Sequence, residues 1–324
     1  MNILITSAGR RVSLLNFFKE ELTKIFPEGK VYITELDPST APAAHIADKY
    51  FRVKKVTDKG YIKQLIDLCK ENNVRLLIPT IDTELPVLAK NKPLFEEAGV
   101  QVVISDPARI ECFQDKRTTH TFFNQMGIKS PKVYEKDNYK IPFFVKPYNG
   151  SRSINTFKIT SEDFIMPYLF KDETLMFLEY LSPDTYDEFT CDMYYDKNGK
   201  LKSVVPRKRI EIRGGEVSKG KTVKNELINF LAEHLGEVKG MQGCVAAQFF
   251  KNKTIDNDIV GIEINPRFGG GYPLTHLAGA NFVKWIIEEY LNGQTIEAKL
   301  DGWEDQLLML RYDDEILVKN HKKS

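Results

Sequence analysis

A predicted strand pair in the last third of the chain carries three side chains with oxygen ligands. Glu263 and Asn265 lie two residues apart in the run IVGIEIN (259–265), so they share one face of that strand, because strand side chains alternate. Gln248, in the preceding apolar run 245–250, faces the same point if the hairpin register allows it. Carboxylate and amide oxygens suit a hard cation such as Mg²⁺. The spacing predicts a metal site at Gln248, Glu263 and Asn265.

An arginine and a glycine turn follow this strand directly. Pro266 stiffens the exit, Arg267 follows it, and Gly269–Gly271 allow backbone to pass close to a ligand. A carboxylate, an amide oxygen and an arginine around one point are typical of a metal–phosphate site. The alternative, a strand with a solvated polar face before a glycine turn, stays open at this point.

Two other segments have the composition of anion sites. Lys146 ends a predicted strand and precedes the small-residue loop NGSRSIN (149–155), which suits a triphosphate although it is not a Walker A loop. Arg207, Arg209, Glu211 and Arg213 alternate along one predicted strand and are expected on one face. Such a face is usually solvated, but it can also neutralise a polyanion.

Composition excludes several function classes. The 324 residues carry a net charge of +1, which gives no support for nucleic-acid or membrane-surface binding. No run approaches 18 apolar residues and no signal peptide is recognisable, so a cytoplasmic protein is expected. The four cysteines form no CxxC, and neither HExxH nor GxSxG occurs, so zinc sites and serine hydrolases have no support.

Strands and helices alternate over residues 1–106, which predicts a parallel sheet with covering helices. Helices are expected at 12–22, 61–72 and 85–98 between short apolar strands. The first loop, TSAGRR, has one glycine where the dinucleotide fingerprint needs three, so NAD binding is disfavoured. Arg10 and Arg11, at a helix N-terminus, can hold an anion, and two solvated arginines are an equally weighted alternative.

A second region begins near Pro107. The pattern of residues 106–128 predicts one helix with Asp115 and Lys116 inside it. Further strands and two helices precede a tail, 301–324, whose last residues KNHKKS are expected to be frayed and solvated.

The order of these pieces resembles the ATP-grasp superfamily, and within it the carbamoyl-phosphate-synthase-like ligases. The resemblance covers residues 107–295 and is carried by DK, VKP, EYL, EFTCDM, PRKR and AAQFF…EINPRFGGG, in that order. It implies α/β and α+β architecture, with a Rossmann-like pre-ATP-grasp sheet before a two-lobed ATP-grasp domain. The expected divisions are 1–106, a small lobe 107–182, a large lobe 183–296 with the metal site, and an extension 297–324.

The resemblance also implies roles for individual residues. ATP phosphates would contact Lys116, Lys146 and the loop residues Gly150, Ser151, Arg152 and Ser153. Adenine would lie against Glu179, Tyr180 and Leu181, and the ribose against Glu188. Mg²⁺, with Mn²⁺ as an alternative, would bind Gln248, Glu263 and Asn265, and Arg267 with Arg207 or Arg209 would steady the transferred phosphate. The loop departs from the family in having only Gly150 where more glycines are usual.

These features predict an ATP- and Mg²⁺-dependent carboxylate–amine ligase that forms an acyl phosphate. Carbamate phosphorylation and non-catalytic ATP binding are the alternatives. Substrates would be a small carboxylic acid and an amine, with Arg10, Asp82, Glu84 and Tyr272 as guesses for their pocket. A homodimer is the default expectation.

Overall fold

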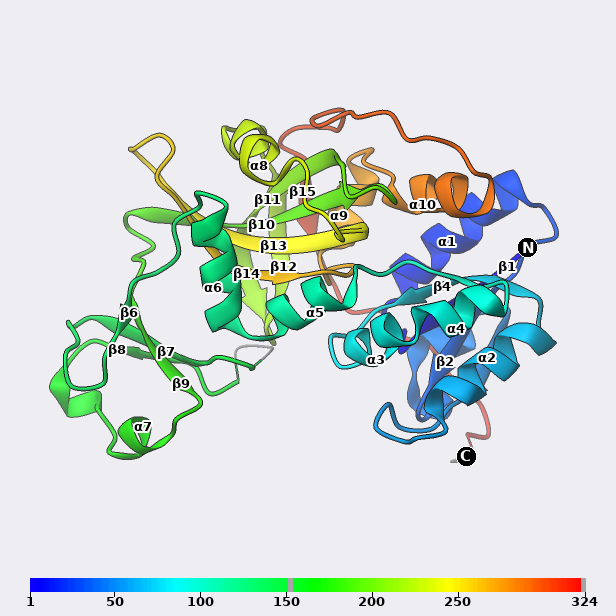
Figure 1. Ribbon diagram of the computed structural model, residues 1–324, viewed down its shortest axis with the longest axis horizontal. Helices are drawn as coiled ribbons and strands as arrows, with labels where there is room; N and C mark the ends of the chain where they lie inside the picture. The colour runs from blue at the N-terminus through cyan, green and yellow to red at the C-terminus, as the bar shows by residue number, and fades with distance from the viewer. Residues whose placement is uncertain (151–153, 322–324) are drawn as a thin grey trace.

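The computed structural model describes residues 1–150 and 154–321, and its strands form three sheets over that part of the chain. A parallel sheet lies at one end of the molecule, a small four-stranded sheet at the other, and a long antiparallel sheet between them (Figure 1). The predicted class, a Rossmann-like sheet followed by a two-lobed domain, is confirmed. No helix in the described residues has the length and apolar run that a membrane crossing requires.

The N-terminal domain is a parallel sheet of order β3-β2-β1-β4-β5 with helices on both faces. In β1, Ile3 and Ile5 belong to one buried cluster and Leu4 to the other, because alternate side chains point to opposite faces. The elements are β1 (Asn2–Thr6), α1 (Val12–Ile25), β2 (Val31–Glu35), η1 (Pro38–Thr40), η2 (Pro42–His45), β3 (Lys49–Arg52), α2 (Tyr61–Glu71), β4 (Val74–Pro79), α3 (Leu85–Lys90), α4 (Lys92–Glu97) and β5 (Gln101–Val102).

The single helix predicted over 85–98 is wrong, because the chain forms α3 and α4 with a break at Asn91. Pro93 causes the break: proline has no N–H, and its ring clashes with the carbonyl four residues earlier in a continuous helix. The proline is tolerated in the first turn of α4.

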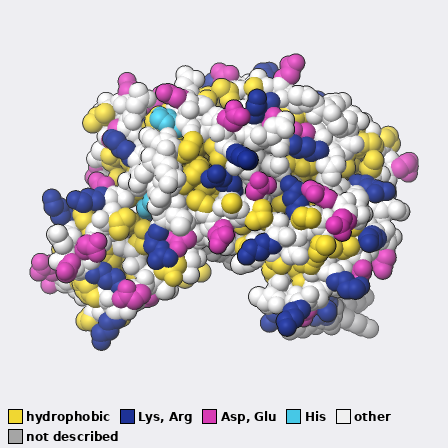
Figure 2. Space-filling model, in the orientation of Figure 1, with side chains coloured by type: hydrophobic (Ala, Val, Ile, Leu, Met, Phe, Trp, Pro, Cys, Tyr) yellow, Lys and Arg dark blue, Asp and Glu magenta, His cyan; other side chains and the backbone are white. Residues whose placement is uncertain are grey.

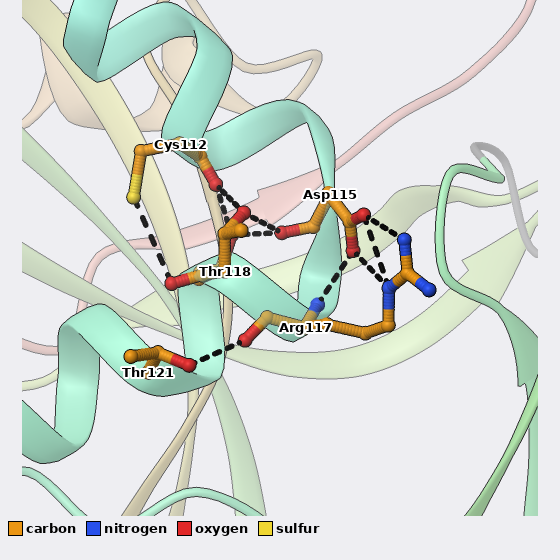
Figure 3. A network of polar contacts seen from close by, with 6 residues as sticks. Cys112, Asp115, Arg117, Thr118 and Thr121 are labelled. Carbon is orange, nitrogen blue, oxygen red and sulfur yellow. Dashed lines mark hydrogen bonds and ion pairs between the residues drawn. The ribbon is translucent and has the colours of Figure 1, made fainter.

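The single helix predicted over 106–128 is also wrong. Asp115 has extended backbone (φ −109°, ψ 121°) and separates α5 (Pro107–Gln114) from α6 (Lys116–Gln125). Its carboxylate accepts a hydrogen bond from the backbone N–H of Arg117 at 2.8 Å, as an N-cap residue does (Figure 3). Thr118 adds a hydroxyl bond to the carbonyl of Cys112 at 2.5 Å, which fixes the corner. Lys116 therefore stands at the first position of a helix.

The small lobe is an antiparallel sheet of order β6-β9-β7-β8 with its own buried cluster, which includes Phe143, Val145 and Phe177. Its elements are β6 (Val133–Tyr134), β7 (Phe143–Pro147), β8 (Phe157–Ile159), η3 (Glu162–Phe164), α7 (Tyr168–Lys171) and β9 (Leu175–Glu179).

The large lobe is an antiparallel sheet of order β14-β13-β10-β11-β12-β15. The long strands β10 and β13 pair over ten residues and form its centre. Its elements are β10 (Tyr186–Tyr195), β11 (Leu201–Arg213), β12 (Glu216–Thr222), α8 (Leu227–Leu235), β13 (Gly243–Asn252), β14 (Ile259–Asn265), α9 (Tyr272–Leu277), α10 (Phe282–Leu291) and β15 (Leu308–Leu310).

The tail contributes a strand that the sequence pattern does not predict. Leu308–Leu310 pairs with β12, and the N–H of Arg311 donates to the carbonyl of Ser218 at 2.9 Å. Residues 319–321 are exposed, as expected of a solvated end, and 322–324 lie outside the described residues.

The N-terminal domain and the large lobe share one hydrophobic core, whereas the small lobe is packed separately. Phe18 of α1 contacts Phe268, which follows β14, at a ring-centroid distance of 5.9 Å. Figure 2 shows an indentation between the small lobe and the N-terminal domain, with charges of both signs mixed over this face. The small lobe therefore has a core of its own, whereas the other two parts pack as one block.

Candidate active site

A cavity of about 320 Å³ lies between the two lobes of the second region. Strands β7 and β9 line it from the small lobe, and β10, β11, β13 and β14 line it from the large lobe. Ten of the residues singled out in the sequence line it: Lys116, Lys146, Gly150, Glu179, Tyr180, Leu181, Glu188, Arg209, Gln248 and Glu263. Three further phosphate candidates, Ser151, Arg152 and Ser153, lie outside the described residues.

The register of β13 and β14 brings the three oxygen-bearing residues together. Gln248 lies directly opposite Glu263, so their side chains share one face of the sheet. Asn265 donates from Nδ2 to Oε1 of Glu263 at 3.0 Å. No group of three or more His, Cys, Asp or Glu in the described part of the chain has the arrangement of a metal site, and this set has a single carboxylate. One carboxylate with amide oxygens fits Mg²⁺, which commonly completes its shell with water and substrate phosphate.

Two lysines from separate elements reach the same cavity. Lys146, on β7, is 7% exposed, and burial lowers its pKa to about 8, with Glu263 raising it and Lys116 lowering it further. Lys116 donates from Nζ to the carbonyl of Gly150 at 2.5 Å. Its backbone N–H donates to the carbonyl of Tyr148 at 2.8 Å, which ties the start of α6 to the end of β7. The break at Asp115 is what allows this approach.

The other end of the cavity is formed by residues 179–181, the segment that joins the two lobes. The N–H of Glu179 donates to the carbonyl of Lys132 at 2.8 Å, so the chain entering and the chain leaving the small lobe run side by side. Burial raises the pKa of Glu188, whose carboxylate pairs with Arg209 at 2.8 Å. Nε of Arg209 is buried and has no acceptor among the described residues, which leaves a donor for a ligand.

The predicted face of four charged side chains on β11 is wrong. A β-bulge between Arg209 and Glu211 shifts the register, so Ile212 lines the cavity beside Arg209. Glu211 instead pairs with Lys219 at 2.6 Å. The bulge was not visible in the alternation of charges.

Arg207 lies behind the cavity, under the glycine turn. Its guanidinium makes two hydrogen bonds of 2.9 and 3.0 Å to Asp192, and both side chains are almost fully buried. Thr275 adds a bond to the same carboxylate at 2.5 Å. A side chain at Gly271 would collide with this guanidinium, which explains the glycine there.

Arg267 connects the N-terminal domain to β14, which we call the metal strand after its predicted ligands Glu263 and Asn265. It makes a bidentate pair with Asp82, at 2.7 and 2.6 Å, and contacts Oδ1 of Asn265 at 3.4 Å. Its guanidinium is thus held beside a predicted metal ligand.

Two of the substrate guesses need correction. Glu84 is fully buried and accepts hydrogen bonds from Thr6, Ser7 and Tyr61, while burial raises its pKa. Tyr272 is 1% exposed and its hydroxyl accepts from the N–H of Val283. Both residues pack the interior, so we assign them structural roles.

Three charged residues beside the glycine turn were missed by sequence reasoning. Asp192 had a signal, since it is a lone carboxylate within the apolar strand TCDMYY. Glu216 and Arg311 pair with each other at 3.0 Å across 95 residues, and no local pattern announces such a pair.

Two family models match the chain. The N-terminal domain of PylC-like proteins matches residues 3–103, and a model described as ATP-grasp in the biosynthetic pathway with Ter operon matches residues 171–307. No curated protein matches the chain by sequence.

Three solved structures illustrate the fold. Pyruvate carboxylase from Rhizobium etli is 12% identical with a TM-score of 0.67, over 91% of this chain and 29% of that one. The biotin carboxylase domain of Hydrogenobacter thermophilus 2-oxoglutarate carboxylase, in complex with MgADP, ADP and bicarbonate, is 16% identical with a TM-score of 0.68, over 95% and 73%. An L-amino acid ligase from Bacillus licheniformis is 17% identical with a TM-score of 0.63, over 90% and 74%.

At these identities the structures show a shared fold, and the chain spans less than a third of the pyruvate carboxylase. The finer resemblance to carbamoyl phosphate synthase stays a prediction. Residues 3–103 thus match a PylC-like N-terminal domain and residues 171–307 match an ATP-grasp domain, and the lobes and the strand order of the structure agree with both matches.

Proposed function

We propose that this protein is an ATP- and Mg²⁺-dependent ligase that joins a small carboxylic acid to an amine through an acyl phosphate. One observation carries the proposal: Lys116 and Lys146 line a single cavity together with Gln248 and Glu263, two of the three predicted oxygen ligands. Cations placed opposite a hard-metal site suit the triphosphate of ATP.

The nucleotide would lie along the cavity from the joining segment to the metal strand. Backbone groups of Glu179, Tyr180 and Leu181 would contact adenine, and Glu188 would accept from the ribose hydroxyls while keeping its pair with Arg209. Lys116 would exchange its bond to the carbonyl of Gly150 for a phosphate oxygen.

Gln248, Glu263 and Asn265 would hold Mg²⁺, with Mn²⁺ as a substitute. A bound Mg²⁺ neutralises charge on the β- and γ-phosphates. Glu263 also lies close enough to Lys146 to raise that lysine's pKa, so the metal strand and the small lobe are electrostatically coupled.

The reaction needs no protein nucleophile. An oxygen of the substrate carboxylate attacks the γ-phosphorus, ADP leaves, and a mixed carboxylic–phosphoric anhydride forms. The amine nitrogen then attacks the carbonyl carbon. The C–O bond of the anhydride breaks, and phosphate leaves with the bridging oxygen. The nitrogen's proton passes to phosphate or solvent. The product is an amide, with ADP and phosphate.

Within this scheme the arginines have different tasks. Arg267 and Arg209 would stabilise charge on the transferred group, since the first contacts Asn265 and the second lines the cavity. Arg207 has no free surface and would hold the Gly269–Gly271 turn in place. The small lobe would close to exclude water, which hydrolyses acyl phosphates.

The comparisons support the proposal. One neighbour of this fold is by its name an L-amino acid ligase, and the biotin carboxylase domain was solved with MgADP. In these neighbours the fold is used with small molecules, as we propose for this chain.

Phosphate release from Mg·ATP tests the function. Wild type would be assayed with pooled carboxylic acids and amines, beside Glu263→Gln and the control Glu211→Gln, which changes an exposed carboxylate outside the cavity. We expect substrate-dependent release that Glu263→Gln reduces at least about a hundredfold and Glu211→Gln preserves. ATP binding without release in any pool would favour the non-catalytic alternative. Release that needs bicarbonate and ammonia, with no other acid, would favour carbamate phosphorylation.

A further inference from the structure

Four arginines converge where the N-terminal domain, the glycine turn and the tail meet. We call this set, with its two carboxylates, the junction cluster: Arg10, Arg11, Arg267, Arg311, Asp82 and Glu216. The arginines come from three separate segments: the β1–α1 loop, the exit of β14 and the residue after β15. Arg311 lies beyond the part of the chain that the ATP-grasp family model matches.

Glu216 is the centre of one half of the cluster. Arg10 and Arg311 donate to the same oxygen, Oε2, at 2.9 and 3.0 Å, so the two guanidinium groups lie close together. The carboxylate also sits over the glycine turn, since a Cβ at Gly270 would lie 3.0 Å from its carboxyl carbon. Gly215, the residue before Glu216, lines the cavity between the two lobes. The pair of arginines therefore stands at the edge of the proposed reaction site.

Within the part of the chain that the structure describes, most donors of these two arginines have no acceptor. Arg10, whose side chain is 68% exposed, makes one side-chain hydrogen bond there, and Arg311 donates only from Nη1, to Glu216 and to the carbonyl of Val217. A guanidinium has five N–H donors. The two groups can accept a further anion without losing Glu216.

Arg11 adds a further positive charge to the cluster. Its guanidinium donates to the carbonyls of Phe268 and Thr80, at 3.1 and 3.0 Å, and has no carboxylate partner among the described residues. Burial and then the nearby Arg267 lower its pKa to about 10, while Glu216 and Asp82 raise it, so these groups act on one another. Burial and then Glu84 raise the pKa of Glu35, so these two carboxylates at the same sheet edge act on each other.

The charges of the cluster do not cancel. Four arginines against Asp82 and Glu216 leave an excess of two positive charges. Helix α1 adds to this excess, because it begins after Arg11 with no acidic residue in its first turn and no side-chain cap. Positive side chains at a helix N-terminus are unfavourable unless an anion is bound there.

We propose that the acid substrate carries a second anionic group, a carboxylate or a phosphate, and that Arg10 and Arg311 bind it. This inference rests on the proposed ligase function and names the substrate class of the same site. The reacting carboxylate would lie toward Arg267 and the metal strand, and the second anion would lie over Gly270. Glu216 would orient the two arginines and at the same time compete with the substrate for their donors.

Hydroxylamine replaces the unknown amine in the test, because it traps acyl phosphates as hydroxamates. One pool contains monoanionic acids (acetate, butyrate, lactate, L-alanine), and the other contains acids with a second anionic group (succinate, glutarate, L-glutamate, 3-phosphoglycerate). We expect Mg·ATP-dependent hydroxamate from the second pool and not from the first.

Variants then locate the second anion. Arg311→Gln and Arg10→Gln should each raise the KM of the responding acid by about ten- to a hundredfold, with little change in kcat or in the Kd for ADP. Arg311→Lys should recover part of the loss, and Glu216→Gln should lower the KM by removing a competing carboxylate. Arg213→Gln is the matched control, because it removes another tail ion pair, to Asp313, outside the cluster.

Three results would overturn the inference. They are turnover of the monoanionic pool alone, an unchanged KM in both arginine variants, or a raised KM in Glu216→Gln, which would make Glu216 the partner of a substrate cation. If wild type forms no hydroxamate from either pool although it binds ATP, the ligase function itself fails, and the inference with it.

Discussion

Lys146 gives the sharpest single prediction, because its charge depends on whether phosphate is present. Burial lowers its pKa from 10.5 to about 8, which corresponds to roughly 3 kcal/mol of unfavourable free energy for the buried ammonium at about 1.4 kcal/mol per pKa unit. At pH 8 about half of the ligand-free molecules therefore have a neutral Lys146. Phosphate oxygens beside the amine favour the ammonium and raise its pKa.

Nucleotide binding should consequently take up protons at alkaline pH. Calorimetry of ADP binding in buffers of different ionisation enthalpy should show an uptake of about half a proton at pH 8 and almost none at pH 6.5. The affinity for ADP should therefore be constant below pH 8. Above pH 8 it should fall by up to about tenfold per pH unit, until the pH reaches the pKa of Lys146 in the complex.

Two variants isolate this effect. Lys146→Gln should abolish both the proton uptake at pH 8 and the alkaline loss of affinity. Lys171→Gln, which changes an exposed lysine of the same lobe, should preserve both. An uptake at pH 8 that persists in Lys146→Gln, or that is absent in wild type, would refute the assignment of a buried, phosphate-binding ammonium to this residue.

Two further predictions concern the support under the glycine turn. Asp192→Asn leaves the buried Arg207 without its counter-charge and should lower the free energy of unfolding by about 3–5 kcal/mol in denaturant titrations, whereas Asp187→Asn, at a partly exposed pair, should cost less than about 1 kcal/mol. Equal losses would contradict this account. Gly271→Ala places a methyl group 2.7 Å from Val217 and against the Arg207 guanidinium. We therefore expect the variant to lose several degrees in Tm and at least tenfold in turnover. Wild-type values of both quantities would show that the turn has room for the methyl group.

Much of the catalytic half of the fold follows from local patterns. Alternation places Glu263 and Asn265 on one face of β14, and the only missing information was the hairpin register, which sets Gln248 opposite Glu263. The parallel sheet follows from alternating apolar strands and amphipathic helices, because each strand is buried on both faces.

Local patterns fail where a single residue or a distant segment decides the structure. An apolar periodicity that runs through Asp115 predicts one helix, but the aspartate is a better cap than an interior helical residue. The bulge at Arg209 and the burial of Arg207 depend on β12 and on the glycine turn. The strand β15 depends on an open sheet edge at β12, which no tail sequence reveals.

The central claim is that this chain activates a carboxylate as an acyl phosphate. An acid that supports turnover would be prepared with ¹⁸O in its carboxylate, and the phosphate released in the presence of ATP and an amine would be examined by mass spectrometry. Attack of the carboxylate on ATP predicts one ¹⁸O atom in each phosphate, because the C–O bond breaks when the amine adds. Phosphate without ¹⁸O would mean that water or another group accepts the phosphoryl group, and it would contradict the proposed mechanism.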